Sequence, residues 1–166
     1  MVSTKTAIQE AESLLYEWTI SSTYPESFRF DPVISPQDFY KAVSTLVEHN
    51  WGYLSAITGI DRPASPTEEN TEVENQIEVL YHFSEGEAVV TLHISIPYSH
   101  LELESICDLI PSASMYEREL MEMLGIDMVG TPDRRKLVLP NEWPDGVYPL
   151  RKSFTGLNDV KFKEIK

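Results

Sequence analysis

The amino-acid sequence predicts an α+β fold in a single domain, followed by an extended, proline-rich C-terminal arm. Segments with apolar residues at helical spacing stand at both ends of residues 1–129, and segments with strictly alternating apolar residues lie between them. This order favours a mostly antiparallel sheet of about four strands, covered by helices on one face. Residues 1–129 would form the α+β domain and residues 130–166 the arm.

Two helices are expected before the sheet. In residues 4–18 the apolar side chains recur three or four positions apart, as one buried helical face requires: Ala7, Ile8, Ala11, Leu14, Leu15 and Trp18. Residues 19–34 are rich in turn formers and hold one short strand at residues 28–30. A second helix begins at SPQD, with Ser35 as N-cap and Pro36 at the first helical position, and ends near Asn50.

The strands follow in the middle of the chain. Residues 51–61 predict a buried strand, and the polar residues 63–75 predict an exposed loop. Residues 76–83 and 88–96 each alternate apolar and polar side chains and are joined by a short turn that contains glycine. This pattern is typical of a β-hairpin.

The second half of the chain predicts helices and then the arm. A helix near residues 102–110 should end before Pro111, and a second helix over residues 115–124 should end at Gly125 in a left-handed C-cap. Ser114 and Glu117 have the spacing of a capping box at the start of that second helix. Four prolines at short intervals exclude a long helix after residue 130: Pro132, Pro140, Pro144 and Pro149.

Composition excludes several classes of function. The chain has a formal net charge of −14, which disfavours direct binding to nucleic acid or anionic lipid. The charge is uneven, because residues 1–129 carry −17 and residues 130–166 carry +3. A basic tail beside an acidic body indicates two different surfaces or partners.

The single cysteine, Cys107, cannot form an internal disulfide or supply the four ligands of an iron–sulfur cluster. A reducing, cytoplasmic setting is therefore expected. The first 15 residues lack the apolar core of a signal peptide, and no stretch approaches the 18 apolar residues of a membrane-spanning helix.

Three acids in the helix over residues 115–124 are the candidate catalytic groups. Glu117, Glu119 and Glu122 could form a general acid/base cluster if two carboxylates shared a partly desolvated site. The structural alternative assigns Glu117 to the capping box and pairs Arg118 with Glu122 at i,i+4. It leaves Glu119 to pair with an arginine elsewhere.

Other catalytic and metal motifs are absent from the sequence. The four histidines never take metal-binding spacing on a helix, although His82 and His93 lie on the two strands of the hairpin and could face each other. The seven glycines form no phosphate-binding loop, and Cys107 has no basic neighbour that would activate its thiol.

The arm has the composition of a protein-binding segment. It carries two basic clusters and two large aromatic side chains: Arg134, Arg135 and Lys136, then Arg151 and Lys152, with Trp143 and Tyr148 between them. Arginine and aromatic residues are enriched where interfaces are energetically strongest. An extended arm must also find hydrogen-bond partners for its backbone on its own domain or on a partner.

The same region resembles the signature of the C subunit of respiratory complex I, the NADH–quinone oxidoreductase. The signature positions are Glu117-Arg118-Glu119, Glu122, Met123-Leu124, Arg135, Leu137 and Val138, followed by Pro149, Leu150, Arg151 and Lys152. The resemblance covers roughly residues 35–154 and includes the strand over residues 51–61 and the hairpin. Residues 137–152 look closer to the matching subunit of energy-converting [NiFe] hydrogenases, so the branch of the superfamily stays open.

The resemblance implies a non-catalytic scaffold subunit in the peripheral arm of a membrane-associated, ion-translocating redox complex. It implies no cofactor in this chain, with iron–sulfur clusters, and nickel-iron or quinone, in partner subunits. The expected partners are the catalytic large subunit and the iron–sulfur subunits, with no nucleic acid and no direct membrane insertion. They would hold the chain on the cytoplasmic side of the cell membrane. The alternative from the residues alone is a small stand-alone enzyme that uses Glu117, Glu119 and Glu122.

Overall fold

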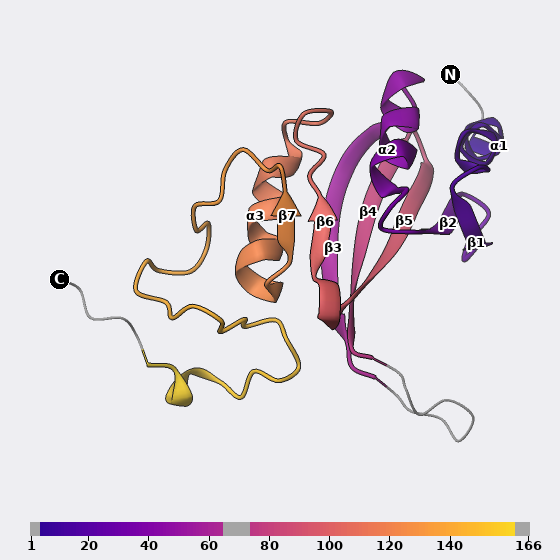
Figure 1. Cartoon of the computed structure of the whole chain (residues 1–166). Helices are drawn as coiled ribbons and strands as arrows, with labels where there is room; N and C mark the ends of the chain where they lie inside the picture. The colour runs from indigo at the N-terminus through magenta and orange to yellow at the C-terminus, as the bar shows by residue number, and fades with distance from the viewer. Residues whose placement is uncertain (1–3, 65–73, 162–166) are drawn as a thin grey trace.

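The structure is a computed structural model that describes residues 4–64 and 74–161 (Figure 1). Its elements follow in the order α1 (Thr4–Leu15), β1 (Thr19–Thr23), β2 (Arg29–Ile34), α2 (Phe39–Glu48), β3 (Tyr53–Arg62), β4 (Gln76–Glu85), β5 (Ala88–Pro97), β6 (Glu102–Glu104), α3 (Ala113–Leu124) and β7 (Asp127–Val129). Short 3-10 turns stand at Tyr98–His100 and Leu157–Asp159.

The main sheet has five strands in the order β1-β2-β5-β4-β3. All neighbours are antiparallel except β2 and β5, which are parallel. The predicted α+β class with a mostly antiparallel sheet is therefore confirmed. The extra strand is β1, which the sequence did not indicate because Thr19–Thr23 is almost fully exposed and has no alternation of apolar and polar residues.

The predicted hairpin is confirmed as β4 and β5, which pair over their whole length from Gln76↔Pro97 to Glu85↔Ala88. Every second side chain of β4 from Ile77 to Phe83 is buried, as the alternation predicted. Gly86 occupies the turn with φ +59°, a left-handed conformation that glycine adopts without steric cost.

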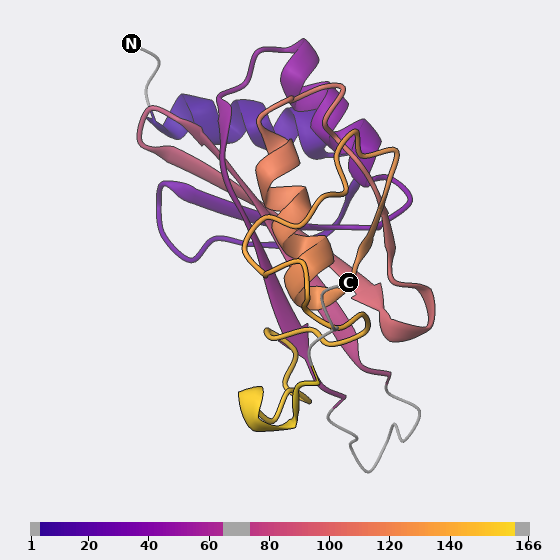
Figure 2. The same ribbon diagram turned by 90° about the vertical axis from the view of Figure 1, so that its left-hand side faces the viewer.

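The three helices cover the same apolar face of this sheet. On α2, the ring of Phe39 packs against Tyr81 of β4, with 4.3 Å between the ring centroids. On α3, Leu120 and Leu124 lie over Gly59 of β3. Figure 2 shows α3 in front of the sheet with α1 and α2 above it, and the buried residues of all three helices belong to one core.

The boundaries of the first two helices differ from the prediction. α1 ends at Leu15 rather than residue 18, because the backbone N–H of Trp18 bonds to the Leu15 carbonyl and the chain turns into β1. α2 begins at Phe39 rather than Pro36. Ser35 Oγ accepts the backbone N–H of Asp38 at 3.1 Å, which closes a turn before the helix instead of capping it.

Two further predictions, one of a strand and one of a helix, also need correction. β3 is not a buried strand, because it is the outermost strand of the sheet and only Ile57 and Asp61 on it are buried. The helix expected near residues 102–110 is wrong as well: β6 lies there and pairs in parallel with β7, with Leu103 opposite Met128. A short apolar run such as this one fits a helix or a strand equally well. The strand partner of β6 is β7, which follows α3 and so could not be seen locally. Most of the expected loop at residues 63–75 lies outside the described residues.

After β7 the described chain contains no helix or strand except the 3-10 turn at Leu157–Asp159. The prolines do exclude a long helix, as expected. The segment does not trail away from the domain, however. It folds back along α3, as the orange and yellow trace in Figures 1 and 2 shows.

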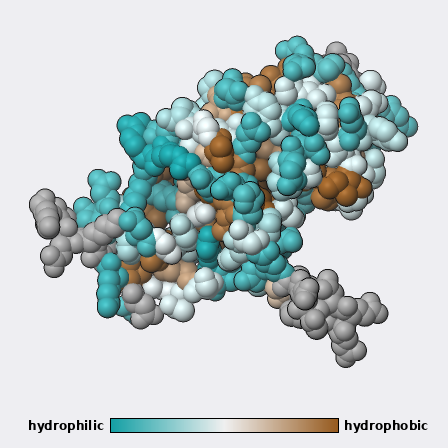
Figure 3. All heavy atoms as spheres, in the orientation of Figure 1, coloured by the Kyte–Doolittle hydropathy of each residue, from teal (hydrophilic) through white to brown (hydrophobic). Residues whose placement is uncertain are grey.

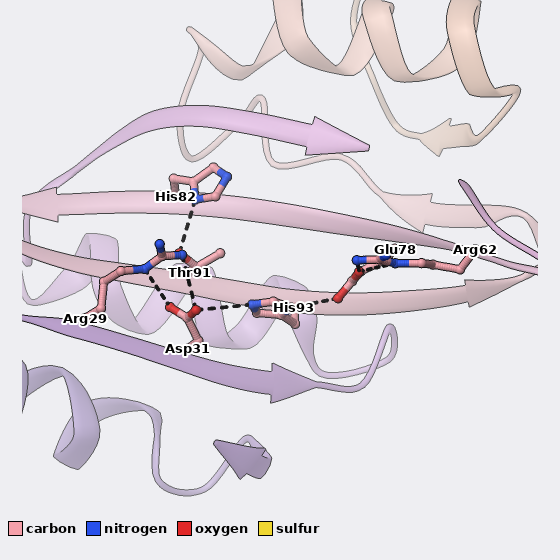
Figure 4. A network of polar contacts seen from close by, with 7 residues as sticks. All are labelled: Arg29, Asp31, Arg62, Glu78, His82, Thr91 and His93. Atoms are coloured by element: carbon pink, nitrogen blue, oxygen red, sulfur yellow. Dashed lines mark hydrogen bonds and ion pairs between the residues drawn. The ribbon is translucent and has the colours of Figure 1, made fainter. Parts of the chain in front are cut away.

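The face of the sheet opposite the helices carries a row of charged side chains that crosses four strands (Figure 4). Arg62 of β3 contacts Glu78 of β4 at 2.7 Å, and Glu78 accepts from His93 Nδ1 of β5 at 2.7 Å. His93 Nε2 lies 3.7 Å from Asp31 of β2, which pairs with Arg29 at 3.2 Å. Opposite charges on neighbouring strands favour this register.

His82 and His93 do not face each other as the sequence suggested. His82 Nδ1 lies 3.1 Å from the hydroxyl of Thr91, whereas His93 lies between two carboxylates (Figure 4). Burial, together with the nearby charge of Arg29, lowers the pKa of His82. The two imidazoles therefore have separate direct partners, and Thr91, Arg29 and Asp31 connect them in one polar network (Figure 4).

The charge row predicts a pH dependence of stability. Burial would raise the pKa of Glu78, but hydrogen bonds from His93 and Arg62 outweigh it and lower the pKa from 4.5. The ionised carboxylate therefore stabilises the fold above its unfolded pKa, and this contribution is lost as the pH falls through the folded value. The difference in free energy of unfolding between the wild type and Glu78→Gln should be constant near neutral pH and shrink below about pH 4.5. Urea denaturation at several pH values measures it.

The matched control for this pH series is Glu10→Gln, on the exposed side of α1. It should follow the wild type at every pH. A constant gap between Glu78→Gln and the wild type throughout the acid range would contradict the prediction.

The packing of α3 on β3 predicts the effect of filling Gly59. A Cβ atom at this position would lie 2.2 Å from Leu124 Cδ1 and 2.7 Å from Leu120 Cδ2. Gly59→Ala should lower the free energy of unfolding by about 1–3 kcal/mol, because the two leucines must shift in a packed core. Thr58→Ala, on the exposed face beside it, should change stability by less than about 0.5 kcal/mol. Equal stability of the two variants in urea would show that α3 is not packed this closely.

Candidate functional site around helix α3

Helix α3 carries the signature residues, and it begins earlier than predicted. The helix starts at Ala113 after Ser112, whose side chain makes no capping hydrogen bond. Ser114 therefore lies inside the first turn, and the predicted capping box with Glu117 is wrong. The spacing of a capping box is present, but Glu117 faces the core instead of the start of the helix.

Glu117 is fully buried and holds the chain segment that follows β6. Its carboxylate accepts the Ser105 hydroxyl at 2.7 Å, the backbone N–H of Ile106 at 2.9 Å and the Cys107 thiol at 3.1 Å. A buried carboxylate is tolerated only where such donors replace water. Burial and the neighbouring Glu117 raise the pKa of the Cys107 thiol, so this cysteine is not an activated nucleophile.

Arg118, the next residue along the helix, points in another direction and binds the segment after β7. Its guanidinium donates to the carbonyl oxygens of Arg135 and Lys136, each at 2.7 Å, and lies 3.4 Å from Asp133. Its side chain is only 13% exposed, so these contacts replace most of its hydration. The i,i+4 pair that the sequence suggested with Glu122 is not formed.

Glu122 binds the same segment through its backbone. Its carboxylate accepts three consecutive N–H groups, from Leu137 at 3.1 Å, Val138 at 2.8 Å and Leu139 at 2.7 Å. The segment has no strand partner here, so Glu122 supplies the acceptors that a neighbouring strand would otherwise provide. Arg118 and Glu122 thus satisfy carbonyl and N–H groups of one continuous stretch.

Further along the segment, a loop closes on Lys136. Its ammonium group donates to the carbonyls of Pro140, Asn141 and Trp143, at 3.2, 3.4 and 2.8 Å. Trp143 is 5% exposed, and its indole N–H donates to the carbonyl of Val147 at 2.8 Å. Trp143 is therefore part of this chain's own packing.

Arg134 and Arg135 pair with carboxylates within the chain. Arg134 contacts Asp127 and also donates to the Met128 carbonyl at 3.2 Å. Arg135 is 83% exposed and lies 2.7 Å from Asp133. Hydrogen bonds from the side chain and backbone of Arg135 hold the pKa of Asp133 well below its usual range.

The end of α3 is bound by the second signature, Pro149 to Lys152. Gly125 ends the helix in the predicted left-handed conformation, with φ +74°, and a Cβ there would lie 2.4 Å from the ring of Tyr148. Leu150 donates its N–H to the Met123 carbonyl at 3.1 Å. Arg151 donates to the Leu124 carbonyl at 2.8 Å.

The guanidinium of Arg151 also contacts two aromatic rings. It lies 4.8 Å from the centroid of Tyr98 and 4.2 Å from that of Tyr148. A cation at a helix C-terminus is favoured by the helix dipole, and contact with aromatic rings adds to this. The second signature therefore caps α3 and holds the returning chain against it.

Asp61 is a residue of this site that the sequence did not reveal. It is 6% exposed, and its carboxylate accepts the backbone N–H of Lys152 at 2.6 Å and the hydroxyl of Tyr98 at 2.7 Å. Burial and the hydrogen bond to Asp61 raise the pKa of Tyr98 to about 12. The sequence did contain one indication of this role, because Asp61 is an acid on the apolar face of a predicted strand, where a charge needs specific partners.

The three glutamates do not share a site. Glu117 points into the core, Glu122 binds residues 137–139, and Glu119 is exposed and forms no ion pair within the described residues. Converging carboxylates are the condition for acid/base chemistry, so this arrangement does not favour the stand-alone enzyme. Over residues 4–64 and 74–161, no group of three or more histidine, cysteine or acidic side chains is arranged to hold a metal ion.

The outer side of the returning segment exposes apolar side chains. Val129 is 49%, Val138 62%, Leu150 51% and Leu157 64% exposed, and the basic side chains of Arg134, Arg135 and Lys152 are exposed as well. We call the exposed side chains of residues 129–157 the arm surface. Apolar side chains beside arginines are characteristic of protein interfaces.

The role of Glu122 can be tested by removing its carboxylate. Glu122→Ala should lower the free energy of unfolding by about 1–3 kcal/mol, because it leaves three N–H groups without their acceptor. Amide hydrogen exchange at residues 137–139 should become faster than in the wild type. Glu119→Ala, three residues away on the same helix, is the matched control and should change neither quantity. Unchanged exchange at residues 137–139 would show that the carboxylate does not hold the segment.

In the part of the chain that the structure describes, no helix is both long and apolar enough to cross a membrane. Comparison with known proteins gives one family model, described as the 30 kDa subunit of respiratory-chain NADH dehydrogenase, which matches residues 32–160.

Among the relatives, membrane-bound hydrogenase subunit beta of Pyrococcus furiosus is 29% identical over 84% of this chain and 69% of its own length. The C subunit of the NADH-quinone oxidoreductase of Moorella thermoacetica is 27% identical over 74% of this chain and 78% of its own length. Formate hydrogenlyase subunit 5 of Escherichia coli is 43% identical over 63 residues, and the match spans only 11% of that protein.

Two solved structures share the fold. The trypsin-resistant fragment of Nqo5 has a TM-score of 0.59 at 19% identity and covers 76% of this chain. A chain in the structure of the membrane-bound sulfane sulfur reductase, an archaeal respiratory membrane complex, has a TM-score of 0.68 at 20% identity and covers 91%.

The match to the family model extends from β2 through α3 to the segment that α3 holds, and it contains both signatures whose contacts are described above. The chain belongs to the family of the 30 kDa subunit of respiratory-chain NADH dehydrogenase, which includes the C subunits of the NADH–quinone oxidoreductases and is related to subunits of membrane-bound hydrogenases.

Proposed function

We propose that this chain is a non-catalytic scaffold subunit in the peripheral arm of a membrane-associated, ion-translocating redox complex. One observation carries the proposal: the signature residues Arg118, Glu122 and Arg151 bind backbone groups of the chain's own returning segment and of α3. These three side chains hold the returning segment in place, and the arm surface on that segment exposes apolar and basic side chains. The family and the relatives, which are subunits of complexes, support the same role.

The expected partners are the catalytic large subunit and the iron–sulfur subunits of the same complex. The cofactors, iron–sulfur clusters with nickel-iron or quinone, would lie in those subunits. They would also hold this chain at the cytoplasmic side of the membrane. The arm surface suits such a contact because its exposed basic groups lie on a chain whose remainder is strongly acidic, which favours one orientation of docking.

The direct test is native mass spectrometry with metal analysis on the tagged chain, drawn from membranes in mild detergent. Recovery with a nickel-containing large subunit and iron–sulfur partners would indicate a hydrogenase complex. Recovery with iron–sulfur and flavin subunits without nickel would indicate a complex I type enzyme. Recovery of the metal-free 19.0 kDa chain alone would contradict the scaffold function.

Arg118→Ala should reduce the amount of intact complex on a native gel, because the loop over residues 133–136 loses the group that fixes its position. Val138→Asp and Leu150→Asp should reduce assembly without changing the stability of the isolated chain in urea, because both side chains are more than half exposed. Lys5→Ala, on the exposed side of α1, is the control and should assemble normally. Normal assembly of Arg118→Ala together with lost activity would instead support a catalytic role.

A further inference from the structure

Strand β1 is an edge of the main sheet without charged or proline residues. It is the outermost strand, and four of its five residues are exposed. Thr19–Thr23 contains no charged residue and no proline, although natural edge strands commonly use these to prevent pairing with other chains. Pairing with β2 is regular from Ser21 to Thr23, after one register shift that leaves Ile20 68% exposed.

Large apolar side chains surround this edge. Tyr16 is 84% exposed and Tyr24 is 56% exposed, and they line an open hollow of about 560 Å³ together with Ile20 and Phe30. The ring of Tyr24 is held in place by stacking on Phe30, with the centroids 5.4 Å apart. Figure 3 shows a mostly hydrophilic face on which an apolar patch lies at the end of the molecule where β1 and β2 are seen in Figure 1.

The border of this hollow is acidic. Glu12 and Glu17 line it, and residues 12–28 contain no lysine or arginine. Burial raises the pKa of the Tyr24 phenol, and the nearby negative charge of Glu12 raises it further. A second copy of this chain would bring the same acids together, whereas a basic segment would be attracted to them.

We propose that the β1 edge accepts an extended, basic segment of another protein chain as an additional strand of the main sheet. Backbone hydrogen bonds to β1 would provide binding. On the side of the added strand that faces α1, apolar side chains would enter the hollow and basic side chains would face Glu12 and Glu17, which line it. This edge is formed by Thr19–Thr23 and is separate from the arm surface on α3. The proposal therefore does not depend on which complex the chain belongs to.

The probe is a synthetic peptide of about eight residues, long enough for one strand, in which valine and lysine take turns at every second position and threonine stands between them, so that valine and lysine share one side. It is added to the full-length chain, and amide hydrogen exchange is followed at residues 19–23. Exchange there should slow as the peptide binds. The same peptide with alternate backbone nitrogens methylated keeps its charge and side chains but cannot complete the ladder, so it should give no protection. A peptide with glutamate in place of lysine should also fail.

Variants of the chain separate the backbone and charge contributions. Ile20→Lys should weaken peptide binding by at least about tenfold, because it places a like charge on the edge and removes an apolar contact. Val138→Lys adds the same charge on the arm surface and should bind as the wild type does. Glu12→Gln combined with Glu17→Gln should weaken binding and reduce its dependence on salt.

Two results would overturn the proposal. The first is the absence of protection at residues 19–23 at millimolar peptide, or equal protection by the methylated peptide. The second is dimerisation of the chain alone in analytical ultracentrifugation that Ile20→Lys abolishes, which would make a second copy the occupant of the edge.

Discussion

Backbone hydrogen bonding is the constraint on which the second half of this structure depends. Over residues 130–161, apart from the 3-10 turn at Leu157–Asp159, the segment after β7 has no helix or strand in which its N–H and carbonyl groups could be paired. Helix α3 resolves this with two side chains one turn apart: Arg118 donates to carbonyls and Glu122 accepts N–H groups. Two charged side chains thus replace a missing strand, and without them the segment would have to stay in water.

The family signature on α3 therefore has a structural role. Acids and an arginine within one helical turn are also the residue types of an acid/base site, and their spacing alone does not distinguish a structural from a catalytic role. The geometry does, because Glu117 faces the core while Arg118 faces the returning chain. Each of these charged groups has several fixed donors or acceptors, which suits a rigid scaffold.

Much of the sheet could be predicted, because β4 and β5 alternate strictly and are adjacent in the chain. The elements that the sequence did not predict lack an apolar pattern or depend on a distant partner. β1 has no apolar pattern, and β6 finds its partner β7 only beyond α3. Within the site, the helix and its Gly125 C-cap were predictable from local chemistry. The partners of Glu122 and the role of Asp61 were not, since they bind backbone groups 15 to 91 residues away.

The contact between Asp61 and the backbone of Lys152 has a consequence for the order of folding. Asp61 belongs to a strand made early in synthesis, and its partner emerges from the ribosome much later. Until then Asp61 is an acid on an apolar face without its full set of donors. The arm surface consequently exists only on a chain whose sheet, helix α3 and returning segment are all in place. Partners that recognise this surface would select finished molecules over folding intermediates.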